Sequence, residues 1–131
     1  RNLAQNLFGV ATRPVLESCT PITRVAAIRL GAAKRDVFRL ARRQRAAVVP
    51  VTEANTRNLI GYVRIVDLHL DEHETVNSVR PLPQVLAGEP HIAALIRLQT
   101  AGEELARVVD EYGETVGVVF AEELTSPLFR G

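Results

Sequence analysis

The chain has 131 residues, of which 47% are hydrophobic and 24% charged, a composition typical of a globular protein that can form a core. Its 16 Lys and Arg residues against 15 Asp and Glu give a formal charge of +1, so we expect no nucleic-acid partner. The single cysteine, Cys19, excludes an internal disulfide, and the apolar runs are too short to span a bilayer. Because the chain begins at Arg1 and contains no methionine, we expect it to be a fragment of a longer protein.

The first half of the chain predicts one small mixed unit after an N-terminal linker at residues 1–14. An extended stretch ends near Gly31, where glycine favours a turn. Apolar residues then recur with helical spacing, which places Val37, Leu40 and Ala41 on one face of a helix. The elements expected are a helix over about 33–45, strands at 46–51 and 59–64 around a polar loop, and a short helix at 65–70.

The second half predicts the same elements in the same order. A charged connector at 71–77 leads into an extended segment at 79–86, and Pro90 suits the first turn of the helix that follows. That helix is expected to stop near Gly102. Strands at 105–109 and 115–120 flank an acidic turn that contains Gly113, which is typical of a β-hairpin, and a last short helix begins at Ala121.

A shared spacing supports an internal repeat. Asp67 follows Gly61 by six positions, and Glu123 follows Gly117 by the same number. Aligning residues 35–51 with 93–109 places Val51 opposite Val109, and residues 60–68 then match 116–124. The sequence therefore predicts an α+β fold of two repeats, 15–77 and 78–131. Neither small sheet can bury both of its faces alone, so we expect the repeats to pack sheet to sheet about a pseudo-two-fold axis.

Three short stretches resemble a known family. Residues 108–113 read Val-Val-Asp-Glu-Tyr-Gly and are followed by Gly-Val-Val at 117–119, Cys19 precedes Thr-Pro, and residues 128–131 read Leu-Phe-Arg-Gly. On these residues the chain resembles a tandem pair of CBS domains, also called a Bateman module, and more narrowly the CorC/HlyC-type pair attached to membrane transporters. The resemblance covers about residues 15–131 and implies two βαββα-like repeats.

The resemblance implies a regulatory module and not an enzyme. Pairs of this type dimerise, lie on the cytoplasmic side of a membrane domain in the same full-length chain, and are linked to magnesium or cobalt transport. Many bind adenine nucleotides in clefts between the repeats, so AMP, ADP or ATP, with Mg²⁺, is the ligand that the resemblance implies.

The family's nucleotide motif reads Gly-x-x-Ser/Thr-x-x-Asp, in which the hydroxyl binds phosphate and the carboxylate accepts hydrogen bonds from ribose. The first repeat keeps the acid at Asp67 but has Arg64 in place of the hydroxyl. The second repeat has Phe120 in place of the hydroxyl and Glu123 in place of the aspartate. Because both hydroxyls are missing, we expect adenine nucleotides to bind weakly or not at all.

Family sites combine the acid of one repeat with the extended segment of the other. The resemblance therefore places Thr20 opposite Phe120 and Glu123, and Asp67 opposite residues 79–81. Arg64 and Arg80 could still hold a phosphate, since a guanidinium matches it bidentately. Any binding should therefore prefer the cleft at Asp67. The other interpretation of Asp67 is a helix cap.

Two further functions stay open. Residues 69–73 read His-Leu-Asp-Glu-His, which matches the H-x-x-E-H motif of some zinc peptidases, with His69, Glu72 and His73 as the chemical groups. That chemistry needs both histidines on one helix and a third ligand. Because residues 69–73 span the end of a short helix and an acidic connector, the favoured interpretation of this stretch is an exposed connector. The other alternative is an interaction domain that binds no ligand.

Overall fold

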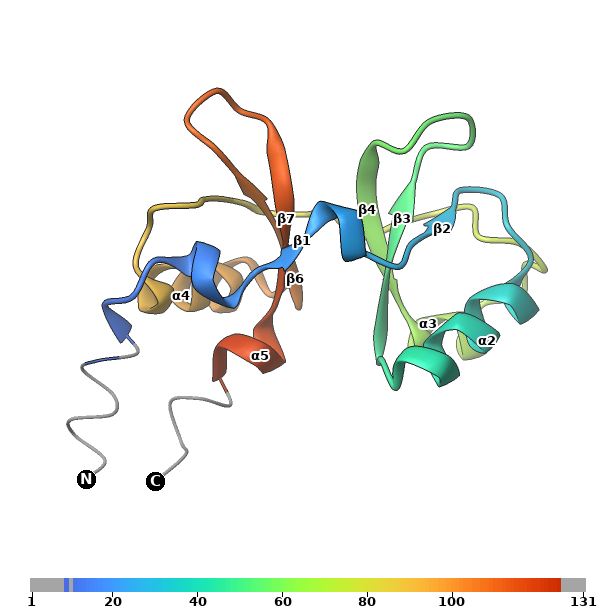
Figure 1. Cartoon of the computed structure of the whole chain (residues 1–131). Coiled ribbons are helices and arrows are strands. Elements are labelled where there is room, and N and C mark those ends of the chain that lie inside the picture. Colours follow the sequence, from blue (N-terminus) through green and yellow to red (C-terminus); the bar gives the residue numbers. More distant parts are fainter. Residues whose placement is uncertain (1–8, 10, 126–131) are drawn as a thin grey trace. The chain divides into compact units, whose positions relative to one another are not determined.

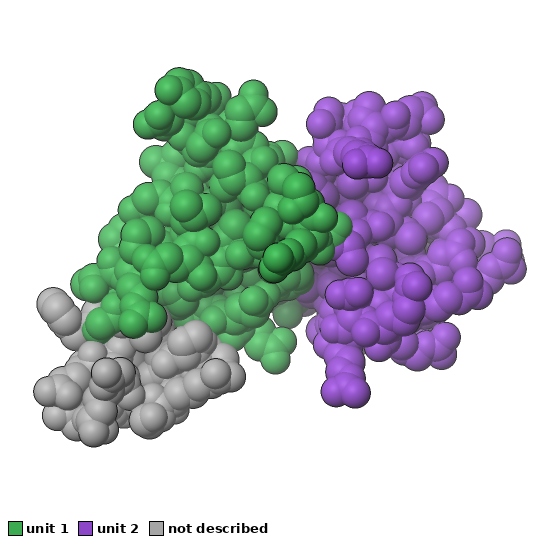
Figure 2. Space-filling view, in the orientation of Figure 1, with its two compact units in different colours: residues 1–25, 83–131 green, residues 26–82 purple. Residues whose placement is uncertain are grey.

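The computed structural model describes residue 9 and residues 11–125, and it is an α+β fold with two sheets (Figure 1). The predicted fold class is thus confirmed. Part of the predicted N-terminal linker, and all of the stretch 128–131, lie outside the described residues. The chain forms two compact units, coloured separately in Figure 2: unit 1 contains residues 1–25 and 83–131, and unit 2 contains residues 26–82.

Unit 2 is a three-stranded sheet with two helices. Its elements are β2 (Ile28–Arg29), α2 (Lys34–Gln44), β3 (Val48–Thr52), β4 (Leu59–Arg64) and α3 (Ile65–Leu70). The sheet order is β2-β3-β4, with β2 parallel and β4 antiparallel to β3. In the hydrophobic core of this unit, the apolar face of α2 packs with buried residues of the strands and with Leu68 of α3. The buried members of the core are Val37, Ala41, Val49, Val51, Val63, Leu68 and Val76.

Unit 1 repeats this plan with an additional strand from the N-terminal segment. Its elements are the 3-10 helix η1 (Val15–Ser18), β1 (Thr20–Pro21), the 3-10 helix η2 (Ile22–Arg24), β5 (Gln84–Leu86), α4 (His91–Ala101), β6 (Leu105–Val109), β7 (Thr115–Phe120) and α5 (Ala121–Thr125). The sheet order is β1-β7-β6-β5. Val15 is fully buried in the core of this unit, beside Val85, Leu98 and Leu124. The N-terminal segment is therefore part of the second half's fold.

Helix ends follow the predicted signals. Pro90 is the N-cap of α4, one position before the helix begins. Gly102 ends α4 with φ of 68°, a left-handed conformation that costs glycine little. Arg45 takes the same role at the end of α2 with φ of 52°. The structure thus places Arg45 and Gly102 at equivalent positions of the two units.

The internal repeat has a different register from the one predicted. A β-bulge interrupts the ladder between Val51 and Thr52 in unit 2 and between Val108 and Val109 in unit 1. Val51 is therefore equivalent to Val108, and the predicted match with Val109 is wrong by one residue. The error arose because Val108 and Val109 are adjacent, so Val51 finds an identical partner in either register. After the turn the predicted match holds: Gly61 pairs with Val51, and Gly117 pairs with Val108. The division into repeats at 15–77 and 78–131 stays a prediction.

Candidate functional site

Each unit contains a place where an extended segment crosses a strand at a glycine. In unit 2 the amide of Tyr62 donates to the carbonyl of Arg80 at 3.1 Å, and the amide of Arg80 donates back at 2.8 Å. A Cβ atom on Gly61 would lie 2.6 Å from Cγ2 of Val79 and would collide with the Arg80 carbonyl. Only glycine permits this approach of two backbones. The crossing brings Arg80 to the end of β4, just before α3.

Unit 1 has the equivalent crossing at Gly117. There β1 pairs antiparallel with β7, with Pro21 opposite Gly117 and Thr20 opposite Val118. A Cβ atom on Gly117 would collide with the carbonyl oxygen of Thr20 and with Sγ of Cys19. Gly61 and Gly117, the repeated glycines of the sequence motif, therefore leave room for the segment that crosses each strand.

A cleft of about 210 Å³ lies beside the crossing in unit 2. Its lining includes Tyr62, Arg64, Asp67, Ser78 and Arg80. Arg80 donates its Nε proton to the hydroxyl oxygen of Tyr62 at 3.3 Å. The structure thus brings together three of the predicted site residues, Arg64, Asp67 and Arg80. The volume is below the roughly 300–1,000 Å³ of typical small-molecule sites.

The Asp67 carboxylate is held by Arg64 within this cleft. Nε of Arg64 donates to Oδ2 at 2.8 Å and Nη2 donates to Oδ1 at 3.0 Å, which is a bidentate pair. Both side chains are partly exposed, at 36% and 43%. Hydrogen bonding from Arg64 lowers the pKa of Asp67, and the positive charges of Arg64 and Arg80 act in the same direction. The carboxylate is thus ionised at neutral pH, and both of its oxygens already accept hydrogen bonds.

Asp67 does not cap its helix. Arg64 occupies the N-cap position of α3, which has no side-chain capping hydrogen bond, and Asp67 lies in the first turn. The interpretation of Asp67 as a cap is therefore wrong. The side chain turns back to Arg64, because a guanidinium three residues earlier offers two donors.

The predicted residues of unit 1 have different surroundings. Phe120 is the half-buried last residue of β7, and Glu123 is an exposed residue of α5. Although the residue as a whole is exposed, loss of water around its carboxyl group, and then the charge of Glu122, raise the pKa of Glu123. Burial and the negative charge of Glu123 also raise the pKa of the Cys19 thiol, which precedes Thr20. The equivalent acids Asp67 and Glu123 are therefore shifted in opposite directions.

Comparison with known proteins identifies the fold. No family model matches the sequence. The UPF0053 protein YugS of Bacillus subtilis strain 168 is 27% identical over 123 residues, which are 90% of this chain and 29% of YugS. The CBS domain of a bacterial CNNM/CorC family Mg²⁺ transporter matches with a TM-score of 0.82 and 28% identity, covering 96% of this chain and 81% of that one. The same kind of domain in complex with ATP matches with a TM-score of 0.81 and 27% identity, over 96% and 94% of the two chains.

The chain is similar in fold and in sequence to CBS domains of the CNNM/CorC type. The resemblance inferred from residues 108–113 and 117–119 is thereby confirmed. This CBS pair spans less than a third of the length of YugS. Among the residues that the structure describes, no helix has the length and hydrophobicity needed to cross a membrane.

The H-x-x-E-H stretch of the CBS pair does not form a metal site. His69 lies in α3, and its ring stacks on Phe38 with centroids 4.5 Å apart. His73 lies beyond the end of α3, where Nδ1 is 2.7 Å from Oδ1 of Asp71. Within residues 9 and 11–125, no group of three His, Cys, Asp or Glu side chains is arranged to hold a metal ion. The helix ends too early to present both histidines on one face, which the zinc motif requires.

Two residues of the CBS pair's cleft were missed in the sequence. Tyr62 is fully buried in the cleft wall and its hydroxyl fixes Arg80. Ser78 lies in the cleft lining and carries a hydroxyl group, which the motif position occupied by Arg64 lacks in this chain. Tyr62 follows Gly61 and could have been noticed as part of the motif. Ser78 could not, because its place depends on the crossing segment.

Proposed function

We propose that this CBS pair is the regulatory module of a larger CorC/HlyC-like membrane transporter concerned with divalent cations. In this proposal it lies on the cytoplasmic side of the membrane domain and works as a homodimer. The likeness to the CBS domain of a CNNM/CorC family Mg²⁺ transporter supports the assignment. The length of YugS, of which the pair spans 29%, leaves room for such a domain in the full-length protein.

We further propose that adenine nucleotides are ligands of the Asp67 cleft, with low affinity. The ATP complex of a similar CBS domain supports the ligand class. The proposed low affinity for nucleotides rests on the bidentate Arg64–Asp67 pair. A ribose needs the Asp67 oxygens as acceptors, so Arg64 has to release at least one of them before ribose can bind. The released guanidinium, together with Arg80, would then be positioned for phosphate.

The second predicted site, at Thr20, Phe120 and Glu123, is the weaker candidate for nucleotide binding. Phe120 replaces a hydroxyl with an apolar ring at the end of β7. Loss of water around its carboxyl group raises the pKa of Glu123, so the environment there disfavours the carboxylate that ribose recognition uses. We therefore assign nucleotide sensing in this chain to unit 2.

Calorimetric titration with AMP, ADP and ATP, with and without Mg²⁺, tests the assignment. Arg64→Thr restores the family's hydroxyl and releases Asp67, so it should bind at least tenfold more tightly than the wild-type protein. Asp67→Ala should remove the binding that remains. Asp36→Ala, on the exposed side of α2, is the matched control and should leave binding unchanged. Tight wild-type binding that survives Asp67→Ala would show that the site is elsewhere. Lack of binding by every variant would favour a ligand-free interaction module.

A further inference from the structure

The two units contain equivalent helix pairs, α2/α3 and α4/α5, which can be compared position by position. Helices α2 and α4 both end in a left-handed residue, Arg45 and Gly102. The amides of Ile65 and Ala121, at the starts of α3 and α5, each donate a hydrogen bond of 2.9 Å to the carbonyl two residues beyond that helix end. These features fix which residues correspond. A property that one helix pair has and the other lacks is therefore not required by the shared fold.

The side of α2 that faces away from the core is strongly basic. Val37 and Ala41 are buried beneath the helix. Spacings of three and four residues align four exposed arginines on the opposite side, and we call them the arginine band: Arg35, Arg39, Arg42 and Arg43. Asp36 is the single acid of α2, and it lies 3.8 Å from Arg39. The outer side of α2 is therefore a row of positive charges.

The outer side of α3 is apolar. Val66 is 58% exposed and Leu70 is 80% exposed, and their spacing of four residues puts them on the same side of the helix. Leu68, on another side of α3, is buried in the core of unit 2. Two large aliphatic side chains of a short helix are thus left in water next to the basic helix.

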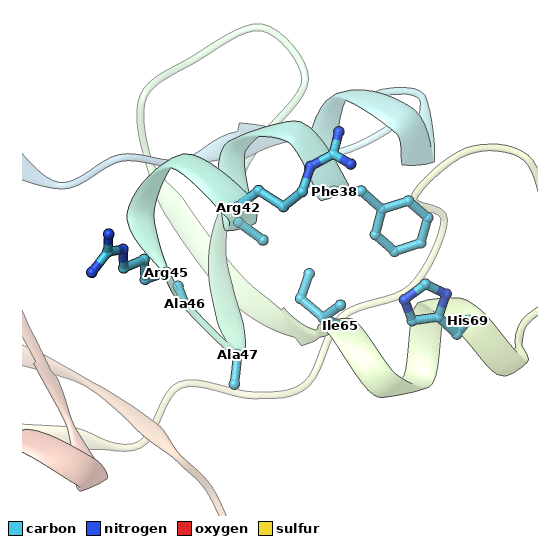
Figure 3. A pocket seen from close by; sticks show the side chains of 8 residues that line it. Phe38, Arg42, Arg45, Ala46, Ala47, Ile65 and His69 are labelled. Atoms are coloured by element: carbon cyan, nitrogen blue, oxygen red, sulfur yellow. The ribbon is translucent and has the colours of Figure 1, made fainter.

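A groove of about 550 Å³ lies between α2 and α3. Figure 3 shows the Phe38 and His69 rings at one end, Ile65 between the helices and Arg45 at the other end. The two rings are stacked, with centroids 4.5 Å apart. Arg42 of the arginine band rises from α2 beside the groove. The α2/α3 face therefore combines guanidinium groups with apolar and aromatic surface.

The matched face of unit 1 lacks both features. Uncharged residues stand at the four positions of the arginine band: Ile92, Ile96, Gln99 and Thr100. Glu122 of α5 stands where α3 has the exposed Val66. Since the two units share one backbone plan, the fold itself requires neither the arginine band nor the exposed aliphatic residues beside it. Their presence in unit 2 indicates a binding surface.

We propose that the α2/α3 face docks on an anionic lipid surface. A bilayer offers a layer of phosphate groups above an apolar interior. The arginine band binds the phosphates, which a guanidinium matches bidentately, while Val66 and Leu70 enter the boundary with the acyl chains. Basic residues beside exposed aliphatic ones are typical of helices that lie in a membrane interface. The inference goes beyond the proposed function and rests on it at one point, the position beside the cytoplasmic leaflet, which is anionic.

A membrane fits this face better than an acidic protein segment does. The arginine band extends along most of α2, and the aliphatic residues lie on a different helix, so charge and apolar surface are spread widely. A protein partner would need acids placed to match the individual arginines, because oppositely charged groups across a protein interface are arranged in register. An anionic leaflet neutralises spread charges without any fixed pairing.

Sedimentation with lipid vesicles tests the docking. The 131-residue chain should bind vesicles of phosphatidylglycerol mixed with phosphatidylcholine, but not phosphatidylcholine alone, and added salt should weaken the binding. Arg42→Glu should lower the binding about tenfold or more, since it replaces a positive charge with a negative one. Arg57→Glu, in the exposed loop between β3 and β4, changes the net charge equally and should have little effect. Equal losses in the two variants, or no binding to anionic vesicles, would overturn the proposal.

Tryptophan fluorescence locates the contact. The chain has no tryptophan, so a single substitution reports on one position. The emission of Leu70→Trp should move to shorter wavelength on anionic vesicles, because the indole ring leaves water for the acyl boundary. Ile96→Trp is the matched control, since Ile96 is a 54% exposed aliphatic residue of α4, and its emission should not move. A shift in Ile96→Trp and none in Leu70→Trp would place the contact elsewhere and overturn the α2/α3 assignment.

Failure of this inference is distinguishable from failure of the proposed function. Nucleotide titration of the Asp67 cleft does not use vesicles, so its outcome is unaffected by the α2/α3 face. Analytical ultracentrifugation identifies the other occupant of this face. Absence of vesicle binding, together with a change of oligomeric state in Arg42→Glu but not in Arg57→Glu, would show that a second copy covers the face and would overturn docking on lipid.

Discussion

His91 donates the proton of its Nε2 atom to the carbonyl oxygen of Leu124, 2.5 Å away, in the interior of unit 1. The carbonyl can only accept, so Nε2 carries the proton, and in the neutral ring Nδ1 then accepts from the hydroxyl of Ser18 at 3.0 Å. His91 is 1% exposed. One side chain thus connects the N-terminal segment, α4 and α5, three elements that are far apart in the sequence.

His91→Ala should destabilise the protein substantially. The substitution leaves the buried Leu124 carbonyl without its donor and opens a cavity, so we expect a loss of roughly 1–3 kcal/mol in the free energy of unfolding. Urea denaturation followed by circular dichroism measures the change. His73→Ala removes an exposed imidazole and should change stability by no more than about 0.5 kcal/mol. Equal effects of the two substitutions would show that the His91 hydrogen bonds contribute nothing.

Gly117→Ala should also destabilise unit 1. The new methyl group would collide with the Thr20 carbonyl and the Cys19 sulfur, so β1 would have to move away from β7 at a cost of roughly 1–3 kcal/mol. Gly88→Ala is the matched control, because a Cβ atom there has nothing within 4 Å and its φ is not positive. The control should be neutral or slightly stabilising in the same denaturation experiment. A harmless Gly117→Ala would mean that the crossing segment is loosely held.

Much of the fold could be predicted because its signals are local. The helix at 65–70 and the strands at 105–109 and 115–120 lie where apolar patterning and the turn at Gly113 placed them. The register of the first strand could not be predicted. Val51 finds an identical partner in either of the neighbouring residues Val108 and Val109, and the β-bulges and the helix ends at equivalent positions decide between the two alignments.

The site residues could be predicted individually, but not their partners. Asp67 was found from its spacing after Gly61, and the crossing segment then brings Arg80 into the same cleft. That Arg64 would bind Asp67 through two hydrogen bonds depends on the rotamers of both side chains. The role of His91 carried no signal in the sequence, since both of its partners are distant residues.

The pKa values of the equivalent acids Asp67 and Glu123 should be shifted in opposite directions from their ordinary values. Carbon-detected NMR should give Asp67 a pKa below its ordinary value of 3.8 and Glu123 a pKa above 4.5. Arg64→Thr should raise the pKa of Asp67 because its main hydrogen-bond donor is lost. Glu122→Gln should lower the pKa of Glu123, but only in part, because loss of water around its carboxyl group is the larger cause. A pKa of Asp67 that does not respond to Arg64→Thr would contradict the ion pair.

The signs of these shifts determine how stability depends on pH. A lowered pKa in the folded state means that Asp67 contributes stability above its unfolded pKa, which is lost as the pH falls through the folded value. A raised pKa means that ionised Glu123 opposes folding above its folded pKa, a penalty that is absent below the unfolded pKa. Glu123→Gln should therefore stabilise the protein at pH 7 and have less effect near pH 4. Thermal denaturation at the two pH values measures the difference.

A fragment of residues 78–131 should not fold by itself, although it contains one complete predicted repeat. The compact unit that includes this stretch also needs residues before 26: Val15 fills its core, and β1 completes the edge of its sheet along β7. Without them the apolar residues around Leu98 and Leu124 lose part of their cover, and β7 presents an unpaired edge that favours aggregation. Amide NMR spectra and light scattering of the fragment measure this. Joining residues 11–25 through a flexible linker to the fragment should restore dispersed amide signals. A monomeric, well-dispersed spectrum from residues 78–131 alone would show that the N-terminal segment is dispensable.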